Sequence, residues 1–419
     1  MNDAGIPGLD ALWRAESPKI IAVLARMLHG DVGTAEELAQ DTLLVALERW
    51  PRDGMPDNPG AWLMATAKRR AIDVLRAHAL HARKHEDIAR ELEDVQAASG
   101  DVVEDAADDD IGDDLLRLVF VACHPVLSTE AQVALTLRLL GGLTTDEIAR
   151  AFLVPEPTVA QRIVRAKRTL GDSDIAYEVP RAEELSERLH AVLAVVYLVF
   201  NEGYSATAGD DWMRPALCEE AMRLGRVLAG LMPREPDVHG LLALMQLQAS
   251  RLQARTAPDG SPILLLDQDR SRWDRTLIGN GLAGLRAAQQ LGGAGGFYAL
   301  QAAIAACHAV ASQPGQTDWT RIAALYAQLL QSAPSPVIAL NHAVAVSMAD
   351  GPQAALELVD QLRDEKALQA YPLLPGVRGD LLDRLGRKTE ARGEFERAAS
   401  LTRNARERAT FEQRAADCG

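Results

Sequence analysis

One stretch of the chain, Leu143–Leu170, constrains the fold most, because its prolines and apolar residues favour two short helices. Thr145 is placed to cap a first helix over Asp146–Phe152, and Pro155 breaks the chain after it. Pro157 then falls in the first turn of a second helix, where a missing N–H costs little. Apolar residues recur along that helix at helical spacing, so one face is buried while basic side chains point elsewhere. They are Val159, Ile163, Ala166 and Leu170. This pattern is typical of a helix-turn-helix that enters a DNA major groove.

The composition agrees with a helical protein. Ala, Leu, Glu and Arg dominate, and aromatic residues make up only 4% of the chain. This balance favours helices over strands. With 419 residues, 48% of them hydrophobic, the chain can form about three domains with buried cores. We therefore expect an all-α fold.

Charge is distributed unevenly along the chain. The net charge is −15, yet residues 59–84 hold six basic side chains against one acidic one, Asp73. Residues 85–114 reverse this, with thirteen acidic side chains and one basic one, Arg90. Like charges repel, so we expect this acidic strip to be an extended linker between two basic modules. An acidic total therefore does not exclude nucleic-acid binding by those modules.

The first module contains an expected amphipathic helix over Ala35–Trp50. Thr34 is its expected N-cap, with Glu37 as the capping-box partner. Pro51 is expected to end the helix. The polar residues of this helix lie on one side and the apolar residues on the other.

A second expected helix, over Gly60–His81, carries Trp62 near its start and several basic residues. Such a helix can bind phosphates and stack on unpaired bases. A solvated charged face over a core tryptophan is the simpler alternative, and charge alone does not decide between them.

Together these segments resemble an extracytoplasmic-function (ECF) sigma factor of bacterial RNA polymerase. AEELAQDTLLVALERW resembles the part of sigma domain 2 that docks on the polymerase, and NPGAWLMATAKRRAIDVLRA resembles the segment that recognises and melts the promoter −10 element. LTTDEIARAFLVPEPTVAQRIVRAKRTL resembles the −35-reading helix-turn-helix of sigma domain 4. With its long C-terminal extension, the chain resembles the ECF subgroup that has an appended tetratricopeptide-repeat (TPR) domain.

The resemblance implies three sets of binding residues. The polymerase-binding set is Glu37, Leu38, Gln40, Asp41 and Leu44. The −10 set is Trp62, Lys68, Arg69, Arg70, Asp73 and Arg76. The −35 set is Thr158, Gln161, Arg162, Arg165, Lys167 and Arg168. The implied partners are core RNA polymerase and promoter DNA, with the C-terminal repeats as a surface for an anti-sigma or signalling protein.

We expect five parts along the chain. They are sigma domain 2 (1–84), the acidic linker (85–114), sigma domain 4 (115–172), a family-specific helical domain (173–292) and TPR-like repeats (293–419). The repeats are indicated by small residues that recur at an offset of 36 residues, such as Ala343 and Gly379, close to the TPR period of about 34. An irregular helical bundle is the alternative.

Two segments have no role in this interpretation, Asn201–Tyr204 and Leu264–Asp274. Acid–base chemistry is conceivable in the second, but no nucleophile pattern accompanies it, so a salt-bridged surface is preferred. Gly279–Gly284 matches G-x-G-x-x-G, but no convincing strand precedes it and no acidic residue follows at the required distance. We therefore read it as a turn or a helix-packing motif.

Several classes of function are disfavoured. The four cysteines lie far apart and form no C-x-x-C pair, so we expect no zinc site, no disulfide framework and no cofactor. The first ten residues lack the features of a signal peptide, and we expect a cytoplasmic protein that spans no membrane. Our interpretation is a sigma factor that is not an enzyme. The alternatives are a helix-turn-helix regulator with a TPR sensor that acts without polymerase, and an enzyme that uses residues 201–284.

Overall fold

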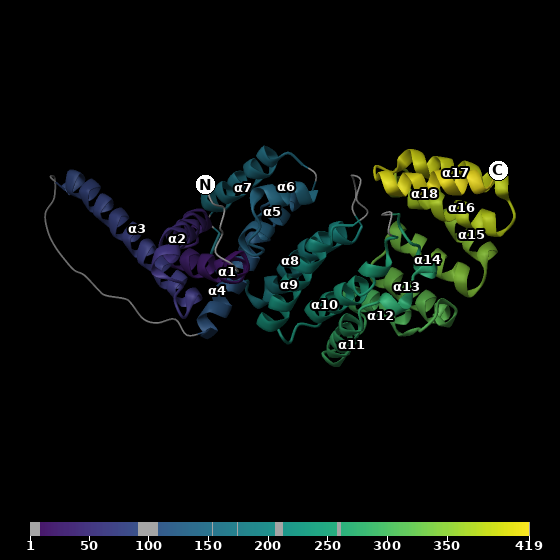
Figure 1. Ribbon diagram of the computed structural model, residues 1–419, viewed down its shortest axis with the longest axis horizontal. Coiled ribbons are helices and arrows are strands. Elements are labelled where there is room, and N and C mark those ends of the chain that lie inside the picture. Colours follow the sequence, from purple (N-terminus) through teal and green to yellow (C-terminus); the bar gives the residue numbers. More distant parts are fainter. Residues whose placement is uncertain are drawn as a thin grey trace. The chain divides into compact units, whose positions relative to one another are not determined.

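The computed structural model describes residues 9–90, 108–152, 154–173, 175–205, 213–257 and 261–418. These residues form α-helices joined by turns and short 3-10 helices (Figure 1). The described part contains no β-strand, and an isolated bridge pairs Thr256 with Pro262. The prediction of an all-α fold is confirmed. The chain forms two compact units, unit 1 (Met1–Val195) and unit 2 (Val196–Gly419).

Unit 1 is built around its first helix. Its helices are α1 (Leu9–Met27), α2 (Val32–Asp53), α3 (Pro59–Arg90), α4 (Asp108–Ala122), α5 (Thr129–Leu139), α6 (Thr145–Phe152), α7 (Glu156–Asp172) and the first part of α8 (Ala182–Tyr204). α1 contacts α2, α3, α4 and α5. Every residue from Ile20 to Ala25 is buried. A helical segment that is apolar all round is stable only inside a packed unit, and residues 20–25 of α1 have that position.

Both ends of α2 differ from the prediction. Its N-cap is Asp31, whose carboxylate accepts hydrogen bonds from the backbone N–H and the hydroxyl of Thr34 at 3.0 and 2.6 Å. The prediction of Thr34 as the N-cap was wrong, because the nearby carboxylate fills that role and starts the helix earlier. Pro51 lies inside the last turn, and the helix ends at Asp53 before Gly54, whose φ is 85°.

The acidic strip is not extended throughout. α3 continues to Arg90 and α4 begins at Asp108, so both ends of the expected linker 85–114 are helical. Residues 91–107 lie outside the described residues. Asp114, the last acidic residue of the strip, is fully buried. It belongs to the packed unit rather than to a linker, because two arginines compensate its charge.

The helix-turn-helix is present as α6 and α7, with one change at its start. The hydroxyl of Thr144 accepts from the N–H of Glu147 at 3.1 Å, and the Glu147 carboxylate accepts from the N–H of Thr144 at 2.8 Å. This reciprocal capping box belongs to Thr144, so the expected cap at Thr145 was one residue too late. The buried face of α7 consists of the four apolar residues that the spacing predicted.

Unit 2 begins with helices packed around α10. Its helices after α8 are α9 (Pro215–Leu231), α10 (Pro236–Ala249), α11 (Arg275–Gln290), α12 (Phe297–Val310), α13 (Trp319–Ser332), α14 (Pro336–Ala349), α15 (Pro352–Gln361), α16 (Leu373–Arg384), α17 (Lys388–Leu401) and α18 (Ala405–Asp417). α10 contacts α9, α11 and α12. The glycine motif Gly279–Gly284 lies inside α11. A Cβ at Gly281 would lie 2.6 Å from Cγ of Leu247, so this glycine allows α11 to approach α10 closely and the helix-packing interpretation is confirmed.

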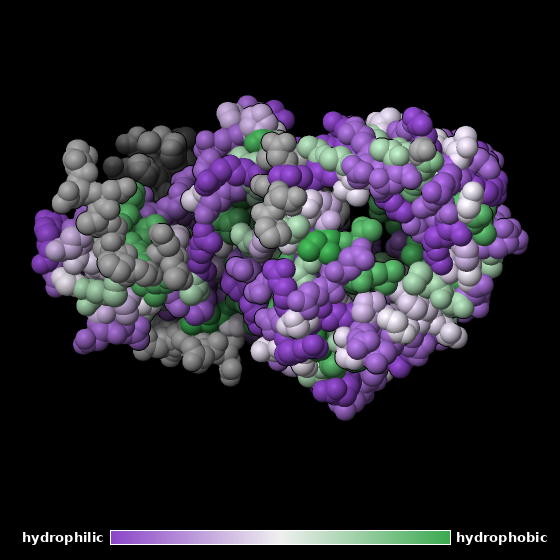
Figure 2. Space-filling view, turned by 45° about the vertical axis from the view of Figure 1, so that its right-hand side comes forward, coloured by the Kyte–Doolittle hydropathy of each residue, from purple (hydrophilic) through white to green (hydrophobic). Residues whose placement is uncertain are grey.

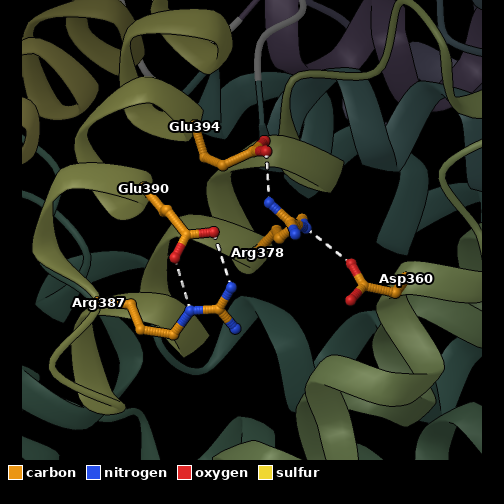
Figure 3. Close-up of polar contacts among 5 residues, drawn as sticks. All are labelled: Asp360, Arg378, Arg387, Glu390 and Glu394. Atoms are coloured by element: carbon orange, nitrogen blue, oxygen red, sulfur yellow. Dashed lines mark hydrogen bonds and ion pairs between the residues drawn. The ribbon is translucent and has the colours of Figure 1, made fainter.

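The last helices of unit 2 follow one another as short-linked neighbours, and α16, α17 and α18 lie side by side (Figure 1). Gly351 and Gly386 have φ of 99° and 77° in the turns before α15 and α17. Arg378 of α16 joins three helices, because its guanidinium donates to Asp360 on one side at 2.8 Å and to Glu394 on the other at 2.7 Å (Figure 3). Its charge is therefore compensated twice.

One face of the molecule is drawn in space-filling form in Figure 2. The face drawn in Figure 2 is mostly purple, with separate hydrophobic patches. Within the described ranges, no helix is both long enough and apolar enough to cross a lipid bilayer.

Candidate functional site

The outer face of α2 presents most of the first predicted set to solvent. Glu37, Gln40 and Asp41 are exposed, and Leu44 is 57% exposed although it is apolar. Leu47, three residues further along the same helix, is 42% exposed, so two large apolar side chains lie close together on this surface. Leu38 differs, because it is only 8% exposed and forms part of the core of unit 1. It is not available to a partner in this structure.

α3 presents the second predicted set beside α2. The rings of Trp62 and Trp50 pack edge to face with their centroids 5.4 Å apart, which anchors the start of α3 against α2. Arg70 forms an ion pair with Asp41 of α2 at 3.0 Å. Arg69 and Arg76 are exposed, whereas Lys68 is partly buried. Asp73 lies 4.0 Å from Arg76, a distance at which an exposed pair contributes little.

The third predicted set is divided by the structure. On α7, Gln161 and Arg165 are exposed, and Thr158 and Arg162 are partly exposed. Val164 is also exposed, so this face combines donors with an apolar contact. Arg168 pairs with Asp172 of the same helix at 3.2 Å. Lys167 lies on the other side, where its ammonium forms an ion pair with Glu36 of α2.

Glu36 is a buried carboxylate between the two modules. It is 3% exposed, and one oxygen accepts from Nε of Arg138 on α5 at 2.5 Å while the other pairs with Lys167. Gln40 donates to the same carboxylate at 2.5 Å. Two cations from one module thus compensate an acid of the other, which offsets the cost of burying it.

Asp114 is a second buried acid of unit 1. Here the acid lies on α4, and one of its two arginines lies on α1 of the first module. This residue of α4 accepts from Arg26 of α1 at 2.7 Å and from Arg117 at 2.5 Å. The Tyr177 hydroxyl adds a further bridge, since it lies 3.1 Å from the carbonyl oxygen of Ala22 in α1 and 3.2 Å from that of Asp114. Tyr177 and the later residue Arg188, which donates to the carbonyl of Phe120 at 2.9 Å, both follow residue 172. The packed unit therefore continues beyond the expected boundary at 172/173.

A cavity of about 410 Å³ lies beside Glu36, between α1 and α2 on one side and α5 and α6 on the other. Gln40 and Leu44 of the first predicted set line it, and Arg14 and Glu147 pair with each other at 2.5 Å across it. Polar and charged side chains thus line part of the junction between the two modules of unit 1.

Comparisons with known proteins agree with this geometry. The family Sigma-70 region 2 matches residues 12–80 and Sigma-70 region 4 matches residues 117–170. An ECF RNA polymerase sigma factor, SigK of Mycobacterium ulcerans (strain Agy99), is 30% identical over 156 residues, which are 36% of this chain and 78% of SigK. The chain belongs to the sigma-70 family of RNA polymerase sigma factors.

Unit 2 of this sigma factor has its own relatives. A family of unknown function, DUF6596, matches residues 188–289. An uncharacterized protein of Rhizobium meliloti (strain 1021), R00370, is 43% identical over 410 residues, which are 98% of this chain and 95% of that protein. The extension is therefore shared, together with the sigma regions, by at least one other protein.

In this sigma factor Cys123 is followed by His124, and Cys307 is followed by His308. No group of three side chains that could bind a metal is found in the described part. Cys123 and Cys307 are buried. Burial raises the pKa of Cys123 to about 11, so its thiol stays protonated and packs against the Thr136 hydroxyl at 3.4 Å. Both cysteines are therefore core side chains in this structure.

The residues that join regions 2 and 4 were not predicted. They are Arg14, Arg26, Glu36, Asp114, Arg138, Glu147 and Tyr177. Glu36 was placed on the polar face of its helix, because nothing nearby in the sequence shows that two cations more than one hundred residues away will cover it. The Thr144–Glu147 capping box was the one readable signal, since Ser or Thr followed three residues later by Glu is a local pattern.

Proposed function

We propose that this protein is an ECF-type sigma factor that binds core RNA polymerase, recognises the −35 and −10 elements and assists in melting the latter. The observation that supports this most directly is the presence of both regions in one chain, each with an exposed polar face. The proposed role involves no covalent chemistry. Its driving force is phosphate contacts, base readout and capture of unstacked bases.

We propose that Glu37, Gln40, Asp41 and Leu44 form the polymerase-binding face. Leu44 gives this face an apolar centre, and the charged residues around it give it orientation. Since Leu38 is buried in unit 1, we assign it to the core beneath this face.

The proposed DNA contacts lie on α3 and α7. For the −10 element they are Trp62, Lys68, Arg69, Arg70, Asp73 and Arg76, and for the −35 element Thr158, Gln161, Arg162, Arg165 and Arg168. Lys167 is proposed to reach DNA only if it separates from Glu36. Guanidinium groups suit bidentate contacts with guanine, and Val164 suits contact with a thymine methyl group.

We propose that unit 2 is a regulatory extension, with a TPR-like array over 293–419 that offers a surface to an anti-sigma or signalling protein. Small residues at the helix contacts support this, because Gly379 allows Phe395 to approach within 2.8 Å of the position of a Cβ. The proposed location is the cytoplasm, where the polymerase acts.

Run-off transcription with core polymerase on the promoter of the protein's own gene tests the function. We expect full-length protein to support initiation, and Leu44→Ala with Asp41→Arg to lose core binding while the fold persists. Glu48→Ala, an exposed change on the same helix, is the matched control. If the wild type binds promoter DNA but never core polymerase, the alternative regulator that acts without polymerase is correct.

A further inference from the structure

The two segments without a role in the sequence meet in unit 2. Tyr204 ends α8, and its hydroxyl accepts a hydrogen bond from Arg251. The Arg251 guanidinium lies 5.8 Å from the ring centre of Tyr204 and 5.8 Å from that of Trp273. Arg270, on the 3-10 turn η3 (Arg270–Arg272), lies 4.9 Å from the same Trp273 ring. One indole ring is therefore shared by two guanidinium groups.

Arg270 is a buried cation whose charge is only partly compensated. It is 5% exposed, and its guanidinium donates to the carbonyls of His308 at 2.8 Å and Ala311 at 2.7 Å and to the hydroxyl of Thr317 at 3.1 Å. Neither Arg270 nor Arg251 forms an ion pair with any Asp or Glu whose position the structure describes. A guanidinium keeps its charge in proteins, so carbonyl dipoles alone leave net positive charge inside the unit.

Unpartnered polar atoms are frequent in the part of the sequence that contains Arg251, Arg270 and Trp273. Of the eleven buried side-chain N and O atoms without a hydrogen-bond partner in the described part, seven belong to residues 248–308. They are Oε1 of Gln248, Oγ1 of Thr256, Oε1 of Gln268, Nε of Arg270, Nε1 of Trp273, Nε2 of Gln301 and Nδ1 of His308. Buried polar groups are nearly always hydrogen-bonded, so such a concentration needs an explanation.

Two of the donors, Nε of Arg270 and Nε1 of Trp273, belong to side chains that contact each other or Arg251. Trp273 is 2% exposed, and its indole N–H has no acceptor. Burial, and then the charges of Arg251 and Arg270, lower the pKa of His308 to about 4, so its ring is neutral at pH 7. Arg251 is only half-buried, which connects the cluster to solvent.

We propose that Arg251, Arg270 and Trp273 bind a small anion, through a carboxylate or phosphate group, in the DUF6596 segment of this sigma factor. The guanidinium fork matches the oxygens of both groups, and a desolvated anion supplies the acceptor that the Arg270 and Trp273 donors lack. Arg255 is not included, because it already stacks on the Tyr204 ring at 3.6 Å and donates to the Tyr204 carbonyl.

A purely structural role for Arg270 explains fewer of these observations than anion binding does. Its three bonds fix the chain after α12, but they leave Nε without a hydrogen-bond partner. Arg378 shows the arrangement of a structural arginine in the same unit, with a carboxylate on each side (Figure 3).

Isothermal titration of the full-length protein with sodium phosphate and with sodium benzoate, at constant ionic strength, tests the proposal. We expect saturable binding of at least one probe, and the probe that binds identifies the ligand as a phosphate or a carboxylate. Arg251→Gln should weaken binding about tenfold, the loss of one charge-assisted hydrogen bond. Arg286→Gln removes the same charge from an exposed position on α11 and should leave the affinity unchanged.

Arg251→Gln is the primary variant because Arg251 is only half-buried, whereas loss of Arg270 could unfold the unit. Circular dichroism of each variant establishes that it is folded before titration. Saturable binding of neither probe, or equal affinity of the wild type and Arg251→Gln, overturns the proposal. Both results are independent of transcription, so the site can fail while the sigma-factor function stands.

Discussion

The junction between regions 2 and 4 and the arginine cluster of unit 2 both bury charge, but they compensate it differently. At the junction, Glu36 and Asp114 are each buried and each held by two cations. In the cluster, Arg270 is equally buried, and no acid among the described residues pairs with it. Burial of a charge is costly unless a partner accompanies it. The junction is thus complete within the chain, whereas the cluster leaves a partner to be supplied.

A third site within unit 2 makes the contrast clearer. Arg378 is only partly buried, with 11% of its side chain exposed. Although burial opposes its charge, hydrogen bonds and ion pairs with Asp360 and Glu394 raise its pKa. For Arg270, burial and the nearby Arg251 lower the pKa. These two arginines of one unit therefore have opposite electrostatic surroundings.

The largest expected effect is at the junction. Glu36→Ala leaves Arg138 and Lys167 without their shared acid, so we expect the unfolding free energy of unit 1 to fall by about 3 kcal/mol. Native-state hydrogen exchange of the α2 and α7 amides in the full chain measures this locally.

Two further variants serve as controls for this prediction. Glu37→Ala changes an exposed carboxylate on the same helix and should cost about 0.5 kcal/mol or less. Replacing Glu36, Arg138 and Lys167 together by Gln, Met and Met should recover most of the loss, because no unpaired charge remains. Equal protection in Glu36→Ala and Glu37→Ala would show that the buried pairs contribute nothing.

An intermediate effect is expected at His308. Its folded pKa of about 4 lies below the ordinary value of 6.5, so the unfolded chain binds more protons between these two pH values. Unit 2 should therefore be most stable above pH 6.5 and lose up to about 1.4 kcal/mol per pH unit as the pH falls toward 4. Denaturant unfolding followed by tryptophan fluorescence measures the slope, and His308→Gln should flatten it. A slope that is the same in both proteins would contradict the assignment.

The smallest effect is expected for Arg14→Ala. The Arg14–Glu147 pair is partly exposed, so its loss should cost about 0.5 kcal/mol or less and should vanish at high salt. Glu147→Ala should cost more, about 1 kcal/mol, since it also removes the capping box of α6. Hydrogen exchange of the α6 amides at low and high salt separates the two. If Arg14→Ala lowers the unfolding free energy by the same amount in high salt, the Arg14–Glu147 pair is screened as little as a buried ion pair, which contradicts the prediction.

Local features of the sequence predicted the helices well. The apolar spacing identified the buried face of α7, and the glycine motif was correctly assigned to helix packing because no strand pattern preceded it. The predicted N-caps of α6 and α2 lay one and three residues away from the observed ones. In each case two nearby residues could cap the helix, as with Asp31 and Thr34. Such a choice depends on neighbours that the local pattern does not contain.

Features that depend on distant residues could not be predicted. Glu36 has an ordinary helix-surface pattern, and its burial follows from the packing of α5 and α7 against α2. The burial of Asp114 could not be predicted either. It is one of thirteen acidic residues in the strip, and nothing in the sequence distinguishes it from those that are not paired. The segments around Tyr204 and Trp273 were recognised as unusual, yet only the fold brings them to one place.

Tyr177 has a consequence for how this protein can be divided. Its single hydroxyl hydrogen is shared between the carbonyls of Ala22 and Asp114, so one phenol group joins α1 to α4. The match to region 4 ends at residue 170, before this tyrosine. A chimera or shortened protein cut at the homology boundary would contain both sigma regions but lack one of the side chains that join them. A change in its promoter activity would then result from a weakened junction between the two regions and not from the loss of a regulatory domain. A truncated form of this sigma factor should therefore keep the residues that hydrogen-bond to the sigma regions, which means all residues through at least Arg188.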